Sequence, residues 1–239
     1  KMSYVLMWLE GPLQSWGVNS KYGRRDTLQF PTKSGILGII LCAMGKGGEQ
    51  KELLSSLSCT DLQVDCFTSE SYKLSMTIED FHMVGANFDE SDPWETLFVP
   101  KKSDGKKSTI GGKKLTYRYY IQNMAFAVYL EVQDVLVNEV CESLKNPVWP
   151  IFLGRKSCVP SELIFQGKFS SKDECIRTAN NIAYGKERIK SFSVLQEDDS
   201  TKGDVLSLSD VPVQFGEHKK YKERYVTIVK AEENAGNIS

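Results

Sequence analysis

The sequence predicts an α+β protein, because strand-like and helix-like segments follow one another in a definite order. That order is strand, loop, helix, pair of strands, long irregular stretch, strand, helix and strand. After residue 170 come one more helix-like segment and two or three strand-like ones. The 239 residues suit one large domain or two small ones, and the apolar fraction of 41% is enough for a real core.

The first half of this order rests on clear local signals. Residues 3–10 are apolar, contain Val, Tyr and Trp, and stop at Gly11-Pro12, which predicts a buried strand followed by a loop. Residues 33–45 predict a helix, with Thr32 or Ser34 as the N-cap and glycines at its end. The segments 62–67 and 73–80 show the alternation typical of strands.

The second half completes the unit. Residues 85–114 are irregular, 117–132 predict a long aromatic strand, and 134–146 predict an amphipathic helix that ends before Pro147. With a last strand near 161–169, the order matches a ferredoxin-like β-α-β-β-α-β unit. A helix over 172–185 and a strand over 224–230 are expected next, and the tail 231–239 is expected to be a linker or a frayed end.

The charge distribution argues for local rather than global binding of a polyanion. The net charge is −1, which by itself does not favour a protein coated in nucleic acid. The basic residues are segregated, however, and a segregated basic patch binds a polyanion locally. Four clusters stand out: Lys21, Arg24, Arg25 and Lys33; Lys101, Lys102, Lys106, Lys107, Lys113, Lys114 and Arg118; Arg155 and Lys156; and His218–Arg224.

Several classes of site are not expected. The six cysteines form no C-x-x-C pair and the two histidines are far apart, so we expect reduced cysteines and no zinc site. No run approaches 18 consecutive apolar residues, and no basic region precedes the first apolar stretch. We therefore expect no membrane span, no secretory signal and a cytoplasmic protein.

The stretch 30–39, FPTKSGILGI, resembles a nucleotide loop only superficially. A Walker A loop needs G-x-x-x-x-G-K-[ST], and the glycine-rich approach to Lys33-Ser34 is missing, so we expect no ATP there. Lys33 and Ser34 instead begin a helix, whose free N–H groups and dipole favour an anion. We expect a phosphate at this point, and close approach of another backbone at Gly35 and Gly38.

Other motifs leave two interpretations open. Gln14, Ser15 and Trp16 lie in a loop, where Trp16 either stacks on an unpaired base or packs over the edge of the core. Arg155-Lys156 suit phosphates, and the alternative is a solvated turn. The basic stretch 101–118 is either a solvated loop or, given its length, a functional one.

Two reactive residue types favour structural roles. We expect Cys158 to be a small buried residue and not a nucleophile, because no histidine lies near it in the sequence. We expect His82 to have a structural or RNA-contacting role and not a catalytic one, because the sequence supplies no obvious acid–base partner.

Taken together, LEGPLQSWG, RRDTLQFPTKSGILGIILCAMG, YYIQNMAF and PIFLGRKSCVP, in this order, resemble the CasD family over about residues 3–169. CasD is the subunit of the type I-E CRISPR Cascade complex that holds the 5′ end of the guide RNA. The resemblance implies an RNA-recognition-like palm of the RAMP superfamily over residues 1–169. A β-hairpin thumb would be inserted at 82–118, and residues 170–239 would form a small C-terminal β-rich extension with a flexible tail.

The same resemblance implies a non-catalytic role in antiviral defence in the prokaryotic cytoplasm, with no cofactor. The palm would grip the 5′ handle of the crRNA and cap the backbone filament, and the thumb would pack against the backbone subunit CasC and the guide. The large subunit CasA would dock beside it, with the other Cascade subunits and target DNA in the assembled complex. The rival is a metal-independent endoribonuclease that processes precursor crRNA, as in relatives said to use a Tyr, Lys and His group.

The expected RNA-binding residues follow from motifs and resemblance together. Lys33 and Ser34 would hold phosphates, Arg24, Arg25, Arg155 and Lys156 would line the same surface, Trp16, Tyr117 and Tyr119 would stack on bases, Gln14 and Ser15 would recognise base edges, and Lys113, Lys114 and Arg118 would add basic contacts. One departure concerns YIQNMAF, where the family usually has Y-L-x-D-A-x-F. Asn123 and Met124 replace Asp and Ala, which removes any contact of that carboxylate.

Overall fold

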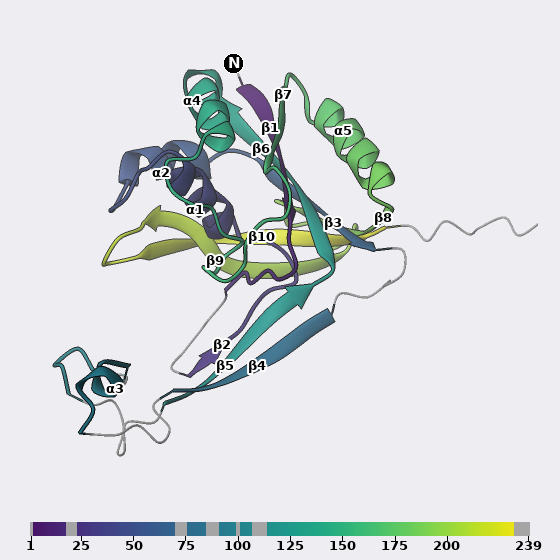
Figure 1. Cartoon of the computed structure of the whole chain (residues 1–239). Coiled ribbons are helices and arrows are strands. Elements are labelled where there is room, and N and C mark those ends of the chain that lie inside the picture. Colours follow the sequence, from purple (N-terminus) through teal and green to yellow (C-terminus); the bar gives the residue numbers. More distant parts are fainter. Residues whose placement is uncertain are drawn as a thin grey trace, which may run out of the picture.

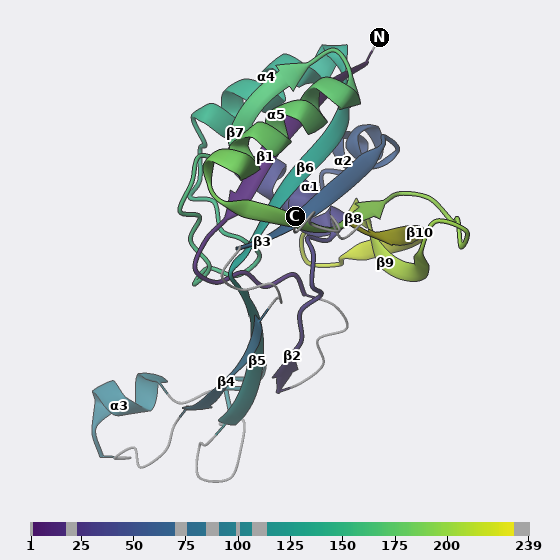
Figure 2. The ribbon, with the colours of Figure 1, turned by 90° about the vertical axis from the view of Figure 1, so that its right-hand side faces the viewer.

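The structure, a computed structural model, describes residues 2–17, 23–69, 76–84, 91–98, 101–106 and 114–231. These residues form a seven-stranded sheet and a separate three-stranded sheet. The small sheet projects from one end of the large one, and the two views agree on this arrangement (Figures 1 and 2). We call the large sheet with its covering helices the palm, and the small sheet with α3 the thumb.

Four strands at one side of the palm sheet have the predicted ferredoxin-like arrangement. They are β1 (Met2–Glu10), β3 (Leu62–Ser69), β6 (Met124–Gln133) and β7 (Phe165–Phe169). Their order is β7-β1-β6-β3, with every neighbouring pair antiparallel, so the first and third strands of the unit lie side by side. The predicted fold class is confirmed.

The C-terminal region adds to the same sheet. β8 (Arg188–Leu195) pairs with β3, and β10 (Lys220–Lys230) and β9 (Asp204–Gln214) continue the order outward. The strands that follow residue 170 therefore belong to the palm sheet. The predicted flexible tail falls on residues 231–239, of which 232–239 lie outside the described residues.

Helices cover both faces of the palm sheet. On one face, α1 (Lys33–Ala43), α2 (Lys51–Ser58) and α4 (Asp134–Lys145) share a core with Val5 and Met7 of β1. On the other, α5 (Lys172–Gly185) packs on Leu6 and Trp8 of the same strand (Figure 2). Because successive strand residues face opposite sides, an apolar run such as residues 5–9 is buried on both.

The thumb is a hairpin with one short added strand. β4 (Met76–Val84) pairs antiparallel with β5 (Lys114–Gln122), and β2 (Arg24–Arg25) pairs parallel with β5. A short helix, α3 (Pro93–Phe98), lies at the end farthest from the palm (Figure 1). The hairpin strands reach from Met76 to Gln122, which is wider than the expected 82–118.

Two local predictions need correction. The predicted continuous strand over 117–132 is interrupted at Asn123, which has a φ of 58° and separates β5 in the thumb from β6 in the palm. Asn is among the few residues that tolerate this left-handed conformation. The helix α2 was not anticipated. The predicted N-cap Thr32 is confirmed, because its hydroxyl accepts a hydrogen bond from the Gly35 N–H.

Neither a membrane-spanning helix nor a metal centre is found among the described residues. None of their helices has the length and apolarity to span a bilayer. The same residues contain no group of three or more His, Cys, Asp or Glu side chains arranged to hold a metal ion.

Candidate nucleic-acid interface

Arginines from three distant parts of the sequence lie together where thumb and palm meet. Arg24 and Arg25 of β2 pair with Tyr117 and Arg118 of β5. Arg155, from the loop after α4, donates from Nη2 to the backbone oxygen of Arg25 at 2.7 Å. We call Arg24, Arg25, Arg118 and Arg155 the arginine cluster. Because successive strand residues face opposite sides, Arg24 lies on the face of the thumb that carries Tyr117 and Tyr119, whereas Arg25, Arg118 and Arg155 lie on the face that carries Tyr120.

Aromatic rings lie under two of these guanidinium groups. Arg24 lies 4.8 Å from the centre of the Tyr119 ring, and Arg155 lies 4.9 Å from that of Tyr120. The Tyr119 hydroxyl donates to Glu79, and this hydrogen bond raises the pKa of Tyr119. Stacking on a ring holds each guanidinium plane while leaving in-plane N–H groups to donate elsewhere.

The Arg155 loop is fixed by a close backbone contact. Gly154 has a φ of 92°, and a Cβ at this position would lie 1.8 Å from the Ser15 oxygen. The Ser15 N–H also donates to the Leu153 oxygen at 3.1 Å. Only glycine fits at this position, because its φ is left-handed and any Cβ would meet the Ser15 backbone.

The face of the thumb that carries Tyr120 has polar groups that the sequence did not single out. Although burial raises the pKa of Tyr120, hydrogen bonding to Ser157, Arg155 and Arg118 outweighs it and lowers the pKa. Two buried side-chain polar atoms in the described part of the chain have no hydrogen-bond partner, Arg155 Nη1 and Thr116 Oγ1. Buried polar atoms are normally paired, so these two atoms are exceptions in the described part of the chain.

His82 does have an acidic neighbour. Its Nε2 contacts Asp80 Oδ2, two residues away on the same face of β4. Asp80 and His82 lie directly opposite Arg118 and Thr116 of β5. An acid two residues away in a strand is the signal that identifies this pair in the sequence.

The expected phosphate contact of Lys33 is wrong, and that of the partly exposed Ser34 stays a prediction. Lys33 is fully buried, and its Nζ donates to the Thr60 oxygen at 2.9 Å and to Gln196 Oε1 at 2.7 Å. Its backbone N–H donates to Asp210 Oδ2 at 2.7 Å. The predicted anion at the start of α1 is therefore a carboxylate of the protein, which leaves no exposed lysine there for RNA. Ser34 donates to Thr32 Oγ1 at 3.2 Å.

Asp210 is itself held by a bidentate ion pair. Arg224 Nε and Nη2 donate to its two oxygens at 2.7 and 2.8 Å. Burial and, to a smaller extent, the nearby charge of Arg224 lower the pKa of Lys33 to about 8. The strands β9 and β10 thus fix the start of α1, which explains why this lysine is internal.

The expected roles of Gln14, Ser15 and Trp16 in base recognition are also wrong, because all three side chains are buried. Gln14 Nε2 donates to the Leu9 and Met124 oxygens at 3.3 and 2.8 Å, and Ser15 Oγ donates to the Tyr119 oxygen at 3.0 Å. Of the two interpretations of Trp16, packing in the core is confirmed. These residues connect thumb to palm.

The two helix glycines behave differently. A Cβ at Gly35 would meet the Trp16 ring at 2.9 Å, so the close neighbour there is a side chain and not the predicted backbone. At Gly38 no atom outside the local helix backbone lies within 4 Å of the position that a Cβ would take, so the prediction is wrong there.

The remaining expected residues differ in position. Lys156 is exposed in the Arg155 loop, and Tyr117 is half-exposed with its ring 5.3 Å from that of Phe81. Lys113 lies outside the described residues, as does the side chain of Lys114 at the start of β5.

Comparison with known proteins agrees with this architecture. The family described as "CRISPR-associated protein (Cas_Cas5)" matches residues 4–227. The chain belongs to the CRISPR-associated Cas5 family. The CRISPR system Cascade subunit CasD of Escherichia coli (strain K12) is 29% identical over 185 residues, covering 72% of this chain and 73% of that protein. The family resemblance expected from the sequence is confirmed.

Two solved structures share the Cas5 fold seen here. A chain of a structure described as "CRISPR RNA-guided surveillance complex" aligns with a TM-score of 0.70 at 22% identity, covering 96% of this chain and 90% of that one. Another, described as "Crystal structure of Cas protein", aligns with a TM-score of 0.57 at 22% identity, covering 95% and 94%. At this identity the likeness concerns the fold.

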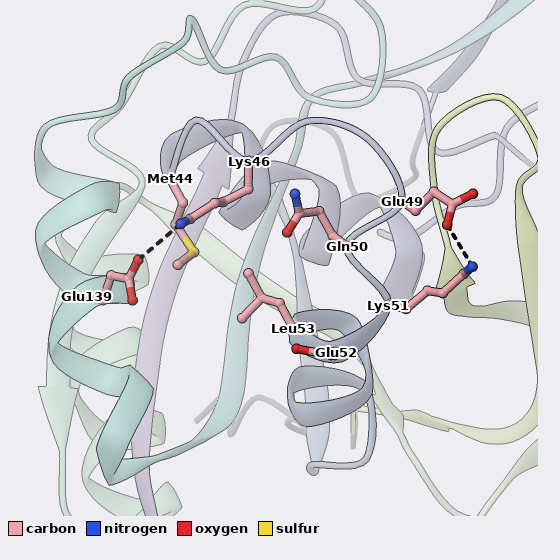
Figure 3. A pocket seen from close by; sticks show the side chains of 8 residues that line it. All are labelled: Met44, Lys46, Glu49, Gln50, Lys51, Glu52, Leu53 and Glu139. Atoms are coloured by element: carbon pink, nitrogen blue, oxygen red, sulfur yellow. Dashed lines mark ion pairs between the residues drawn. The ribbon is translucent and has the colours of Figure 1, made fainter.

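A pocket of about 420 Å³ on this Cas5 protein lies away from the arginine cluster, between α1, α2 and α4 (Figure 3). Its charged lining is largely paired, with Lys46 4.0 Å from Glu139 and Lys51 2.6 Å from Glu49. The lining residues are Met44, Lys46, Glu49, Gln50, Lys51, Glu52, Leu53 and Glu139. With three acids against two lysines, this pocket does not favour RNA.

Proposed function

We propose that this Cas5 protein is the non-catalytic subunit of a Cascade surveillance complex that holds the 5′ handle of the crRNA at the thumb–palm junction. The observation that carries the proposal is the arginine cluster, in which three separate segments of the chain bring arginines to the thumb–palm junction. Guanidinium groups match phosphate oxygens in geometry and charge. Membership in the family and the likeness to a Cascade subunit support the assignment to such a complex.

The aromatic residues beside the cluster suit a single-stranded handle. Tyr117 and Tyr119 lie on the same face of β5, next to the Arg24 guanidinium. Sequence-specific RNA recognition usually acts on unpaired bases that stack on aromatic or guanidinium planes. We therefore assign phosphates to the arginines and Lys156, and bases to Tyr117, Tyr119 and the Arg24 plane.

The outer face of the thumb suits the backbone subunit. Met83 of β4 lies directly opposite Leu115 of β5, and these two side chains and Phe81 are each between 49% and 53% exposed. A contiguous exposed apolar face usually marks a protein interface. We propose that CasC packs there and that the protein thereby caps the backbone filament. CasA, the other Cascade subunits and target DNA would meet it in the assembled complex.

Charge reversal of two exposed residues tests RNA binding without disturbing the core. We expect Arg24→Glu with Lys156→Glu to weaken assembly on guide RNA and to expose the handle to nuclease. Because this double variant removes two phosphate-binding side chains, the slope of log K against log salt should fall by about 1.4. The matched control reverses two exposed lysines of the β9–β10 hairpin, Lys219→Glu with Lys222→Glu. Equal assembly and equal salt slopes in both variants would show that RNA does not bind at this site.

A second function has one observation in its favour. Cleavage of precursor crRNA needs a positioned acid–base pair, and His82 contacts Asp80 opposite Arg118. We expect the isolated protein to leave precursor RNA intact in the absence of metal. Specific cleavage that His82→Ala abolishes, and that a charge-neutral change elsewhere on the thumb preserves, would replace the binding role with an endoribonuclease.

A further inference from the structure

Arg188 contacts three of the four places where the chain passes between palm and thumb; the fourth is the return from β2 to α1. Its Nη1 donates to the Asn123 oxygen at 2.8 Å, at the single residue between β5 and β6. Its Nη2 donates to Glu10 Oε1 at the end of β1, from which the chain leads to β2. Its backbone pairs with Ser69 at the end of β3, which leads to β4.

The side-chain contacts of Arg188 are shielded from water. The side chains of Arg188 and Glu10 are 15% and 13% exposed. Glu10 is held in place because its Oε2 accepts a hydrogen bond from Trp8 Nε1 at 2.7 Å. Charge-assisted hydrogen bonds of this kind are short and strong, and partial burial reduces their screening by salt.

Asn123 is the point at which the thumb angle is set. Its left-handed backbone interrupts an otherwise continuous strand, and its oxygen is held by Arg188. On the neighbouring residue, the Met124 oxygen accepts from buried Gln14, which also binds the Leu9 oxygen beside Glu10. Arg188 and Gln14 therefore connect the same two strand ends from β8 and from the loop after β1.

We propose that Arg188 is a positioning residue that fixes the thumb relative to the palm, so that the arginine cluster meets successive RNA phosphates at the correct spacing. The cluster contains Arg118 from the thumb and Arg155 from the palm, so its geometry depends on the angle between them. This inference rests on the proposed RNA-binding function. It assigns to the C-terminal extension, which supplies β8, the orientation of the thumb.

Arg188→Met tests the proposal because it keeps a long apolar stem and removes both donors. The matched control is Arg177→Met, which makes the same change at an exposed position on α5. In the full-length protein, spin labels on non-canonical amino acids at exposed Met83 (thumb) and Asn180 (palm) report the distance between the two parts. This labelling avoids the six native cysteines. Assembly with guide RNA is measured in parallel.

We expect Arg188→Met to broaden the distance distribution and to weaken apparent RNA affinity by about 10- to 100-fold, with the control unchanged. The affinity falls because only the fraction of molecules with the correct angle binds. If Arg188→Met does not fold, Glu10→Gln, which keeps the shape and removes the charge, should produce a smaller change of the same kind. Arg188→Lys should restore part of the affinity.

Two results would overturn the positioning role. An unchanged distance distribution with reduced affinity would indicate that Arg188 contacts RNA directly. A broadened distribution with full affinity would show that the thumb angle does not affect RNA binding. Failure of the proposed function is distinguishable, because Arg24→Glu with Lys156→Glu would then leave affinity intact whatever the thumb distance does.

Discussion

The internal carboxylate at the start of α1 allows a quantitative prediction for Asp210→Ala. The change removes the two hydrogen bonds from Arg224, at 2.7 and 2.8 Å, and the one from the Lys33 N–H, at 2.7 Å. Arg224, whose side chain is 9% exposed, would remain buried without its partner. Breaking a buried pair in this way costs about 3–5 kcal/mol. Urea unfolding followed by circular dichroism measures the loss.

Two further variants separate this explanation from a general effect of surface mutation. Asp26→Ala removes the partner of Arg24 in an exposed pair and should leave the unfolding midpoint nearly unchanged. Asp210→Ala combined with Arg224→Met removes both charges and should recover most of the loss. If Asp210→Ala costs no more than Asp26→Ala, or if the double variant is no more stable than Asp210→Ala alone, the buried pair does not stabilise the protein in this way.

Three other predictions concern single residues. Gly154→Ala should destabilise by at least about 2 kcal/mol in urea unfolding, because its Cβ would meet Ser15 and its φ is 92°, whereas Gly38→Ala should stabilise by about 0.5–1 kcal/mol. With a folded pKa of about 8 for Lys33, wild-type stability relative to Lys33→Met should rise by about 3 kcal/mol between pH 8 and 10.5. Trp16→Phe should preserve RNA affinity in filter binding. A large loss of affinity without unfolding would instead support stacking of Trp16 on an RNA base.

The palm could be predicted from sequence because its signals are local. Residues 3–10 form an apolar run, and 134–146 show helical periodicity with a proline behind, so strand and helix followed from composition and spacing. The helix α2 was not predicted because it has only eight residues and starts from Gln50, which has a φ of 50° and makes no side-chain cap. The break at Asn123 carried no signal beyond a residue type that tolerates left-handed backbone.

The site was predictable only in part because its geometry depends on partners far along the chain. The exposed arginines were identified by charge, but their association requires Arg155 to reach Arg25, 130 residues away. Lys33 was misassigned because its N–H partner, Asp210, lies 177 residues away. A helix start that favours an anion does not reveal whether the anion belongs to a ligand or to the protein itself.

The most direct test of the account is a cross-linking map of guide RNA whose 5′ handle carries photoreactive 4-thiouridine. In the assembled complex, we expect cross-links to the β5 segment around Tyr117 and Tyr119 and to the loop containing Arg155 and Lys156. Arg24→Glu with Lys156→Glu should weaken them. Cross-links from the handle to the β9–β10 hairpin alone, with none at the thumb–palm junction, would contradict the account.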